Sequence, residues 1–281
     1  MKFTKMQGCG NDYVFIDCFA ERLGDIAAFA RFVSNRNFGV GSDGLICIGP
    51  SDNADFKMEM YNSDGSPAQM CGNGIRCLAK YVYDKGLTDK SEITVETGNQ
   101  IKRLLLNIKD REIESVRVDM GSPELRPQFI PIAEHGINFI NRSVIANGRE
   151  YFLTAVNVGN PHAVTFVDEV DNYDVQTIGP MFENHPLFPE RVNVEFVQLI
   201  DRKTLKMRVW ERGSGETLAC GTGATAAVVA AILNGFTDNK VKVILRGGEL
   251  FIEWDRENDK IYMTGPAVTV FDGELYLQNE V

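Results

Sequence analysis

The sequence predicts an α+β protein built from two pseudo-symmetric domains, each a curled and mostly antiparallel sheet around a central helix. Short segments that alternate apolar and polar residues dominate the chain, few helices interrupt them, and landmarks of the first half recur in the second. Alternation with period two is typical of half-buried strands. A chain of 281 residues is long enough for two domains.

The predicted strands are short and spread over the whole chain. Alternating segments lie at 56–60, 93–95, 116–118, 192–196, 205–209 and 240–243. Two more strands are expected near the end, at 267–271 and 274–278, where they can complete either domain.

Four helices are predicted, at 25–35, 73–84, 174–184 and 223–233. In the second, apolar residues follow the i, i+3, i+4, i+7 spacing of one helix face. The residues of the fourth helix are small and apolar on every side, so this helix must be buried all round. In a strand-rich domain this predicts a helix enclosed by a curled sheet.

The two halves of the chain carry matching landmarks. Cys71 and Cys220 each open a Cys-Gly-x-Gly turn before a predicted helix, and they are 149 positions apart. The pairs Gly10-Asn11 and Gly159-Asn160 have the same separation, and so do Asn62 and Glu211. This register favours duplication of a half-chain over chance.

The duplication predicts a link near 120–127, a segment rich in turn residues. A pseudo-twofold arrangement of the domains would bring the two helix N-termini face to face across a cleft, which is a favoured place for a ligand.

Two cysteines at helix N-termini indicate acid–base chemistry. The positive end of a helix favours the thiolate form of a thiol. One thiolate can remove a proton from Cα while the opposite thiol delivers one to the other face, which inverts the stereocentre. Backbone N–H groups in the two turns would stabilise the substrate carboxylate as charge grows on it. Those N–H groups belong to Gly72, Asn73, Gly221 and Thr222.

Two side chains are candidate helpers of the thiols. His162 would accept the proton of a neighbouring cysteine, and the carboxylate of Glu211 would keep a neighbouring thiol protonated. The spacing does not decide which helper pairs with which cysteine, nor which thiol is charged at rest.

Composition and charge exclude some classes of binding partner. The net charge of −10 argues against a nucleic-acid partner, and no apolar run of membrane-spanning length occurs. The N-terminus lacks the shape of a signal peptide, so the cytoplasm is the expected location.

No metal-binding spacing and no cofactor motif is present, so we expect neither metal nor cofactor. Cys18 and Cys47 lie in apolar runs, which predicts core packing.

The chain resembles the diaminopimelate epimerase family over nearly its whole length. The motifs that carry this resemblance are Gly10-Asn11-Asp12-Tyr13, Tyr61-Asn62-Ser63-Asp64-Gly65-Ser66, Met70-Cys71-Gly72-Asn73-Gly74-Ile75-Arg76-Cys77, Gly159-Asn160-Pro161-His162, Arg191-Val192-Asn193 and the long run from Glu211-Arg212-Gly213 to Cys220-Gly221-Thr222-Gly223.

The resemblance implies cofactor-independent conversion of LL- to meso-diaminopimelate, in lysine and peptidoglycan precursor biosynthesis. It implies Cys71 and Cys220 as the two bases, supported by His162 and Glu211. It implies that the last strands return to the first domain, giving 1–119 with 267–281, and 120–266, with the active site between them. The implied substrate contacts come from Asn11, Asn62, Asn160, Asn193, Glu211 and Arg212, and the implied carboxylate cradle from Gly72, Asn73, Gly221 and Thr222.

One position departs from the family pattern. Many members carry glutamine where this chain has Gly44. A side-chain contact to the substrate is then missing, or is replaced by backbone or water.

Other functions remain open at this point. A racemase of another amino acid, such as histidine, would share the machinery, although Arg212 and Glu211 favour a substrate with a distal amino-acid group. Proline racemases typically have Cys-Gly-His where this chain has Cys71-Gly72-Asn73. A binding protein of the same fold with redox-sensing cysteines is another class, because two facing thiols could form a disulfide. A cysteine hydrolase would need one thiol with a dedicated histidine and an oxyanion hole, and it would leave the second Cys-Gly-x-Gly turn unexplained. The oligomeric state is also open, a homodimer included.

Overall fold

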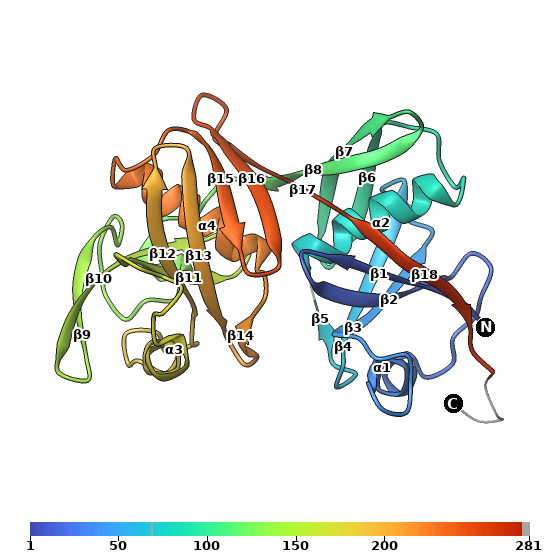
Figure 1. The fold of residues 1–281 in the computed structure, drawn as a ribbon, viewed down its shortest axis with the longest axis horizontal. Coiled ribbons are helices and arrows are strands. Elements are labelled where there is room, and N and C mark those ends of the chain that lie inside the picture. Colours follow the sequence, from blue (N-terminus) through green and yellow to red (C-terminus); the bar gives the residue numbers. More distant parts are fainter. Residues whose placement is uncertain (69, 277–281) are drawn as a thin grey trace. The chain divides into compact units, whose positions relative to one another are not determined.

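The computed structural model describes residues 1–68 and 70–276, which form two compact units (Figure 1). The first unit consists of Met1–Val118 together with the segment that begins at Gly265, and the second is Asp119–Thr264. The described helices are α1 (Ile26–Ser34) and α2 (Gly72–Asp84) in the first unit, and η1 (Pro127–Phe129), α3 (Val175–Glu183) and α4 (Gly221–Leu233) in the second.

The strands of the first unit pair in a mostly antiparallel order. The last strand, β18, pairs with β1, which is followed by β2, β3, β4, β6, β7 and β8; β5 is a short addition to β4. Their bounds are β1 (Lys2–Gly8), β2 (Asn11–Asp17), β3 (Gly44–Gly49), β4 (Phe56–Asn62), β5 (Pro67–Ala68), β6 (Glu92–Thr97), β7 (Gln100–Lys109), β8 (Glu112–Gly121) and β18 (Val268–Glu274).

The second unit repeats this order. Strand β9 pairs with β10, followed by β11, β12, β13, β15, β16 and β17, and β14 is a short addition to β13. Their bounds are β9 (Arg142–Ala146), β10 (Arg149–Asn157), β11 (Pro161–Phe166), β12 (Asn193–Asp201), β13 (Thr204–Glu211), β14 (Gly215–Thr217), β15 (Lys240–Leu245), β16 (Gly248–Asp255) and β17 (Lys260–Gly265).

The predicted fold class is confirmed. Helix α4 packs against β10, β11, β12, β13, β15 and β16, and nearly all of its residues are buried. In the first unit α2 packs against β1, β2, β7 and β18. Each central helix therefore lies within the curve of its own sheet (Figure 1). A surface made of alanine and valine suits α4 to this position because strands can approach it from every side.

The four predicted helices are all present, and their caps explain their bounds. The side chains of Asp25 and Asp174 accept hydrogen bonds from backbone N–H groups at the first turns of α1 and α3. Helix α4 begins at Gly221, earlier than predicted, because Cys220 already serves as its N-cap. Sequence periodicity therefore located the helices, while side-chain caps set their ends.

The repeat extends well beyond the landmarks seen in the sequence. Helices α1 and α3 are 149 positions apart at both ends, and so are α2 and α4. Strand registers recur with the same separation: Tyr13 pairs with Gly44 as His162 pairs with Asn193. In the next sheet pairing, Ile46 lies opposite Met60 as Glu195 lies opposite Val209. Positions 149 apart therefore occupy equivalent places in the two units.

The C-terminal prediction is partly wrong. Strand β18 is continuous across Val268–Glu274 and pairs with β1, whereas two strands were expected at 267–271 and 274–278. Leu275 and Tyr276 are not in a strand, and the rest of the second predicted strand lies outside the described residues. The backbone follows the edge of β1 through the bulge between Lys5 and Met6, so no turn divides the segment.

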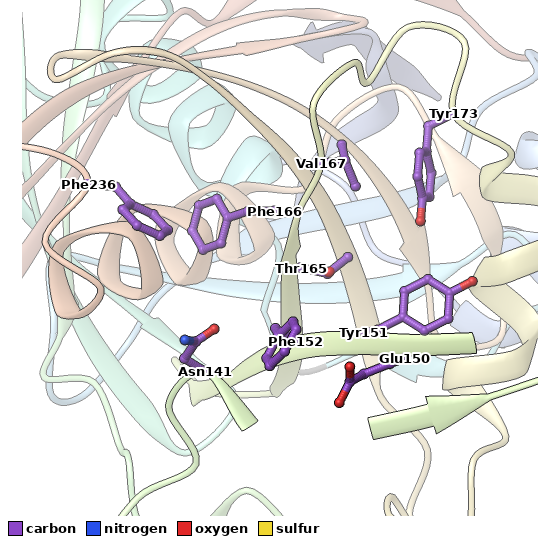
Figure 2. Close-up of a pocket in the computed structure, with 9 residues that line it drawn as sticks. All are labelled: Asn141, Glu150, Tyr151, Phe152, Thr165, Phe166, Val167, Tyr173 and Phe236. Carbon is purple, nitrogen blue, oxygen red and sulfur yellow. The ribbon is translucent and has the colours of Figure 1, made fainter. Parts of the chain in front are cut away.

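One pocket of about 370 Å³ opens in the second unit (Figure 2). Aromatic rings dominate its lining. Two of them, Phe166 and Phe236, pack edge to face with 4.8 Å between their ring centroids. None of the predicted site residues lines this pocket. Among the described residues, no helix is long and apolar enough to span a membrane.

Candidate active site

The two predicted cysteines occupy the same position in their units. Cys71 is the N-cap of α2 and Cys220 is the N-cap of α4, with nearly identical backbone angles (φ −130°, ψ 118° and φ −125°, ψ 115°). Each sulfur accepts a hydrogen bond of 3.3 Å from a glycine N–H in the first turn, Gly74 in α2 and Gly223 in α4. Both thiols therefore lie where a helix presents unpaired N–H groups.

In the first unit, the polar side chains of Asn11 and Tyr13 contact Cys71. Its thiol lies 3.3 Å from Oδ1 of Asn11, and the hydroxyl of Tyr13 donates to its sulfur at 3.4 Å. Burial, and then the nearby Cys71, raise the pKa of Tyr13 well above its ordinary value. Tyr13 thus remains a hydrogen-bond donor to the sulfur. The sulfur of Cys71 thus accepts from Tyr13 and Gly74, while its thiol donates to Asn11.

Asn73 is fixed by a buried arginine. Its amide donates to Oδ1 of Asn11 at 3.3 Å, and its own Oδ1 accepts from Nη2 of Arg76 at 2.8 Å. Arg76 is fully buried and also donates to the carbonyls of Gly72 and Pro266. Desolvation lowers the pKa of Arg76. These bonds hold the Gly72-Asn73 turn in one conformation.

The remaining predicted residue of this unit lies at the end of β4. Asn62 donates through its amide to the hydroxyl of Ser66 at 3.0 Å, and its backbone pairs with Gly44. At Gly44 an added Cβ would lie 2.2 Å from the carbonyl oxygen of Tyr61. The backbone of β4 therefore fills the space that a side chain at position 44 would need.

In the second unit, acidic groups surround Cys220. Its sulfur lies 3.4 Å from Oγ1 of Thr222, and the charge of Glu211, whose Oε1 accepts from Oγ1 of Thr217, acts on the thiol. Burial raises the pKa of Glu211. Burial and the charges of Glu211 and Glu195 raise the pKa of the Cys220 thiol well above its usual range.

The N–H of Gly223 at the helix N-terminus lowers the pKa of Cys220, as expected, but burial and the charges of Glu211 and Glu195 raise it by more. These effects favour the thiol form of Cys220. The role predicted for Glu211, to keep a neighbouring thiol protonated, stays a prediction.

His162 also belongs to the second unit, on β11. Its Nδ1 lies 2.7 Å from Oε1 of Glu195 and its Nε2 lies 2.9 Å from Oδ1 of Asn160. Both His162 and Glu195 are fully buried. Both candidate helpers, His162 and Glu211, therefore belong to the same unit as Cys220.

Asn193 and Arg212 are joined in the same unit. The amide of Asn193 donates to the carbonyl of Pro161 at 2.8 Å, and its Oδ1 accepts from the backbone N–H of Arg212 at 3.0 Å. The exposed guanidinium of Arg212 donates to the carbonyl of Glu190 at 2.9 Å and keeps further donors free for an anion.

Sequence reasoning missed three residues of these sites: Tyr13, Arg76 and Glu195. The repeat contained a signal for two of them. Tyr13 is 149 positions before His162, and Glu195 is 149 positions after Ile46, which lies beside the first cysteine's helix. Arg76 had no such signal, because an arginine in an amphipathic helix normally faces solvent.

No metal site accompanies these residues. Over 1–68 and 70–276, no group of three or more histidine, cysteine, aspartate or glutamate side chains could hold a metal ion. The described site chemistry is that of thiols, carboxylates, one imidazole and backbone N–H groups.

Comparison with known proteins agrees with this geometry. The family model described as diaminopimelate epimerase matches residues 3–126 and 154–270. The chain belongs to the diaminopimelate epimerase family. A diaminopimelate epimerase of Agathobacter rectalis is 56% identical over 98% of this chain and 99% of its own length. One from Acetivibrio thermocellus is 55% identical over 99% of both chains.

Solved structures show how widely this family's fold is shared. A hydroxyproline epimerase from Agrobacterium vitis aligns with 98% of this chain and 90% of its own, with a TM-score of 0.69 at 13% identity. A Bacillus anthracis protein of the PhzF family aligns over 99% of both chains, with a TM-score of 0.68 at 16% identity. At these identities the likeness concerns the fold.

Proposed function

We propose that this protein epimerises LL-diaminopimelate to meso-diaminopimelate by proton transfer between two cysteines and one Cα, without a cofactor. One thiolate takes the Cα proton and becomes a thiol. The electron pair left on carbon is delocalised into the carboxylate, and the second thiol then gives its proton to the opposite face of Cα and becomes a thiolate. This chemistry requires both thiols to reach one carbon of the substrate.

The observation that carries the proposal is the equivalence of Cys71 and Cys220 in a chain of this family. Both are N-caps of the central helices, and both sulfurs lie beside N–H groups of a Cys-Gly-x-Gly turn. Preorganised N–H groups at the helix N-termini stabilise the negative charge that develops on the substrate carboxylate. Those in the two turns are the N–H groups of Gly72, Asn73, Gly221 and Thr222.

The surroundings of the thiols assign their starting roles. Cys220 keeps its proton because burial and the carboxylates of Glu211 and Glu195 raise its pKa. It is therefore the acid toward LL-diaminopimelate. Cys71, which accepts from Tyr13 and Gly74, is the base. In the reverse reaction these roles exchange.

The distal end of diaminopimelate carries a second carboxylate and a second ammonium group. We propose that Arg212 binds this carboxylate, because its guanidinium is exposed and offers two parallel donors. Amide and carboxylate oxygens of Asn62, Asn193 and Glu211 are the proposed acceptors for ammonium. Asn11 and Asn160, which flank Cys71 and His162, would orient the reacting end.

Proton exchange in deuterium oxide tests this function. The protein is incubated with LL-diaminopimelate, and deuterium at Cα is followed by mass spectrometry in substrate and product. We expect meso product that carries solvent deuterium while recovered LL substrate is still largely unlabelled early in the reaction. Replacement of either cysteine by alanine should lower turnover by at least about 10³-fold. Exchange on a single amino acid such as histidine, without exchange on diaminopimelate, would refute the assignment.

We further propose that the protein works in the cytoplasm as a homodimer. The support for a dimer is the cluster of exposed apolar residues on β18, where Val268, Val270 and Phe271 are 42%, 54% and 45% exposed. Light scattering of the wild type should give twice the mass of the 281-residue chain, and Val270→Asp should lower it to that of one chain. A monomeric wild type would contradict the dimer.

A further inference from the structure

A buried carboxylate that is not among the predicted site residues lies beside Cys220. Glu195 is on β12, is fully buried, and holds Nδ1 of His162 at 2.7 Å. An added Cβ at Gly223 in α4 would lie 2.7 Å from Oε1 of Glu195 and 3.3 Å from the sulfur of Cys220. The missing side chain at Gly223 therefore leaves room for the carboxylate at the first turn of the helix.

The second oxygen of this carboxylate has no partner. Oε2 of Glu195 is buried and accepts no hydrogen bond from any described residue. An unsatisfied buried carboxylate oxygen is costly for folding, and such groups concentrate at functional sites. Packing alone gives no reason to keep a glutamate here.

In the first unit, the position equivalent to Glu195 carries no carboxylate. Ile46 is the counterpart of Glu195, and its Cδ1 would lie 2.5 Å from an added Cβ at Gly74, the counterpart of Gly223. The counterpart of His162 is Tyr13, which donates to Cys71. The backbone thus accepts isoleucine at this position, and the glutamate is specific to the unit that contains His162.

We infer that Glu195 is a positioning residue for the epimerisation: its carboxylate fixes the orientation and tautomer of His162 beside the N-terminus of α4. This inference rests on the proposed function. An ionised carboxylate only accepts hydrogen bonds, so Nδ1 of His162 carries a hydrogen. Nε2 of the same ring lies 2.9 Å from Oδ1 of Asn160, so Asn160 is the partner of the other ring nitrogen.

Two substitutions separate the parts of this role. Glu195→Ile copies the first unit's own residue, so it fits the space and removes both the charge and the acceptor. Glu195→Gln keeps an acceptor for Nδ1 and removes only the charge. Because the inferred role of Glu195 is exerted through His162, we expect kcat to fall about 10²-fold in the isoleucine variant and less in the glutamine variant, with KM changed by less than about twofold.

A spectroscopic readout reports on His162 without any turnover. The chain has only three histidines, His135, His162 and His185, so ¹⁵N-labelled imidazole signals are few and each is assigned by a single His→Asn variant. We expect a protonated Nδ1 on His162 in the wild type. In Glu195→Ile the ring should lose this tautomer preference, and Glu195→Gln should keep it. The signals of His135 and His185 should not move.

Glu216→Gln is the matched control. Glu216 is also a buried carboxylate of the second unit, but it pairs with Arg208 at 2.7 Å instead of with the imidazole. Its replacement should lower thermal stability and leave the His162 signals in place. Wild-type His162 signals together with wild-type kcat in Glu195→Ile would overturn the inference. Absence of diaminopimelate turnover in the wild type would refute the proposed function instead, and the imidazole signals would still test whether Glu195 sets the tautomer.

Discussion

At the scale of single residues, the described polar side chains that have no exposed surface lie near the first turns of the two central helices. Arg76, His162 and Glu195 are each fully buried. Arg76 donates a hydrogen bond to Asn73, two positions after Cys71, and Glu195 is hydrogen-bonded to His162. Buried charged groups are retained in proteins when they are paired or when they serve a site. Of these residues, Glu195 raises the pKa of the Cys220 thiol, and Arg76 holds Asn73 close to Cys71.

Replacing Glu211 by glutamine should make Cys220 more reactive at a given pH. The negative charge of Glu211 raises the pKa of Cys220, so its removal lowers that pKa and increases the thiolate fraction. We expect the rate of alkylation by iodoacetamide, plotted against pH, to shift to lower pH for the peptide that contains Cys220. Quantitative mass spectrometry measures each cysteine separately. An unchanged profile for Cys220 would contradict this electrostatic role, and Cys47 serves as a buried internal control.

Replacing Arg76 by methionine should destabilise the first unit strongly. The substitution leaves the carbonyls of Gly72 and Pro266 and the amide oxygen of Asn73 without their donor. We expect a loss of about 3 kcal/mol or more in the free energy of unfolding. Arg76→Lys keeps the charge but lacks the planar fork, so it should recover only part of the loss. Urea unfolding followed by circular dichroism gives the comparison, and a midpoint equal to that of the wild type would argue against the network.

At the scale of elements, the thiols are structural caps as well as chemical groups. Each cysteine accepts the N–H of the residue three positions later, as serine does at many helix N-termini. The central helices begin at these residues because the caps satisfy a donor that the helix itself leaves free.

Serine and alanine at position 220 should therefore separate stability from catalysis. Cys220→Ser keeps a capping oxygen, so its melting temperature should stay close to that of the wild type. Cys220→Ala loses the cap and should cost about 1 kcal/mol. Neither variant should turn over substrate at the wild-type rate. Differential scanning calorimetry tests the difference, and equal melting temperatures for the two variants would show that the cap contributes nothing.

The elements also show how much the sequence could predict. Periodicity located all four helices, and the turn motifs placed both cysteines. The alternation of Val192-Asn193-Val194-Glu195-Phe196 predicted a half-buried strand with its polar residues toward solvent. Strand β12 is instead buried on both faces from Asn193 to Val197. Periodicity cannot distinguish a polar residue that faces solvent from one that faces a buried imidazole, so Glu195 was missed.

At the scale of the whole molecule, the chain leaves its first unit and returns to it. Strand β18 lies beside β1, with Lys2 opposite Glu274 at one end and Gln7 opposite Val268 at the other. The second unit is one continuous segment, whereas the first depends on residues from both ends of the chain.

Removal of residues 267–281 should therefore damage the two units unequally. The truncation exposes the edge of β1 and uncovers the apolar side of α2 that packs on β18. We expect limited proteolysis to degrade residues 1–118 first and to leave a protected fragment close to 119–264. Equal degradation of both halves would contradict the independence of the second unit. The full-length chain, digested in parallel, provides the control.

The 149-residue repeat has a consequence for how such a protein can evolve. An assembly of two identical half-chains would need the same residue at position 46 of each copy, whether isoleucine or glutamate. Once both halves lie on one chain, each copy can mutate alone, and here isoleucine lies beside the first cysteine's helix while a glutamate and a histidine lie near the second. Joining the copies therefore allows the two thiols, which we propose to act on opposite faces of one Cα, to have different neighbours.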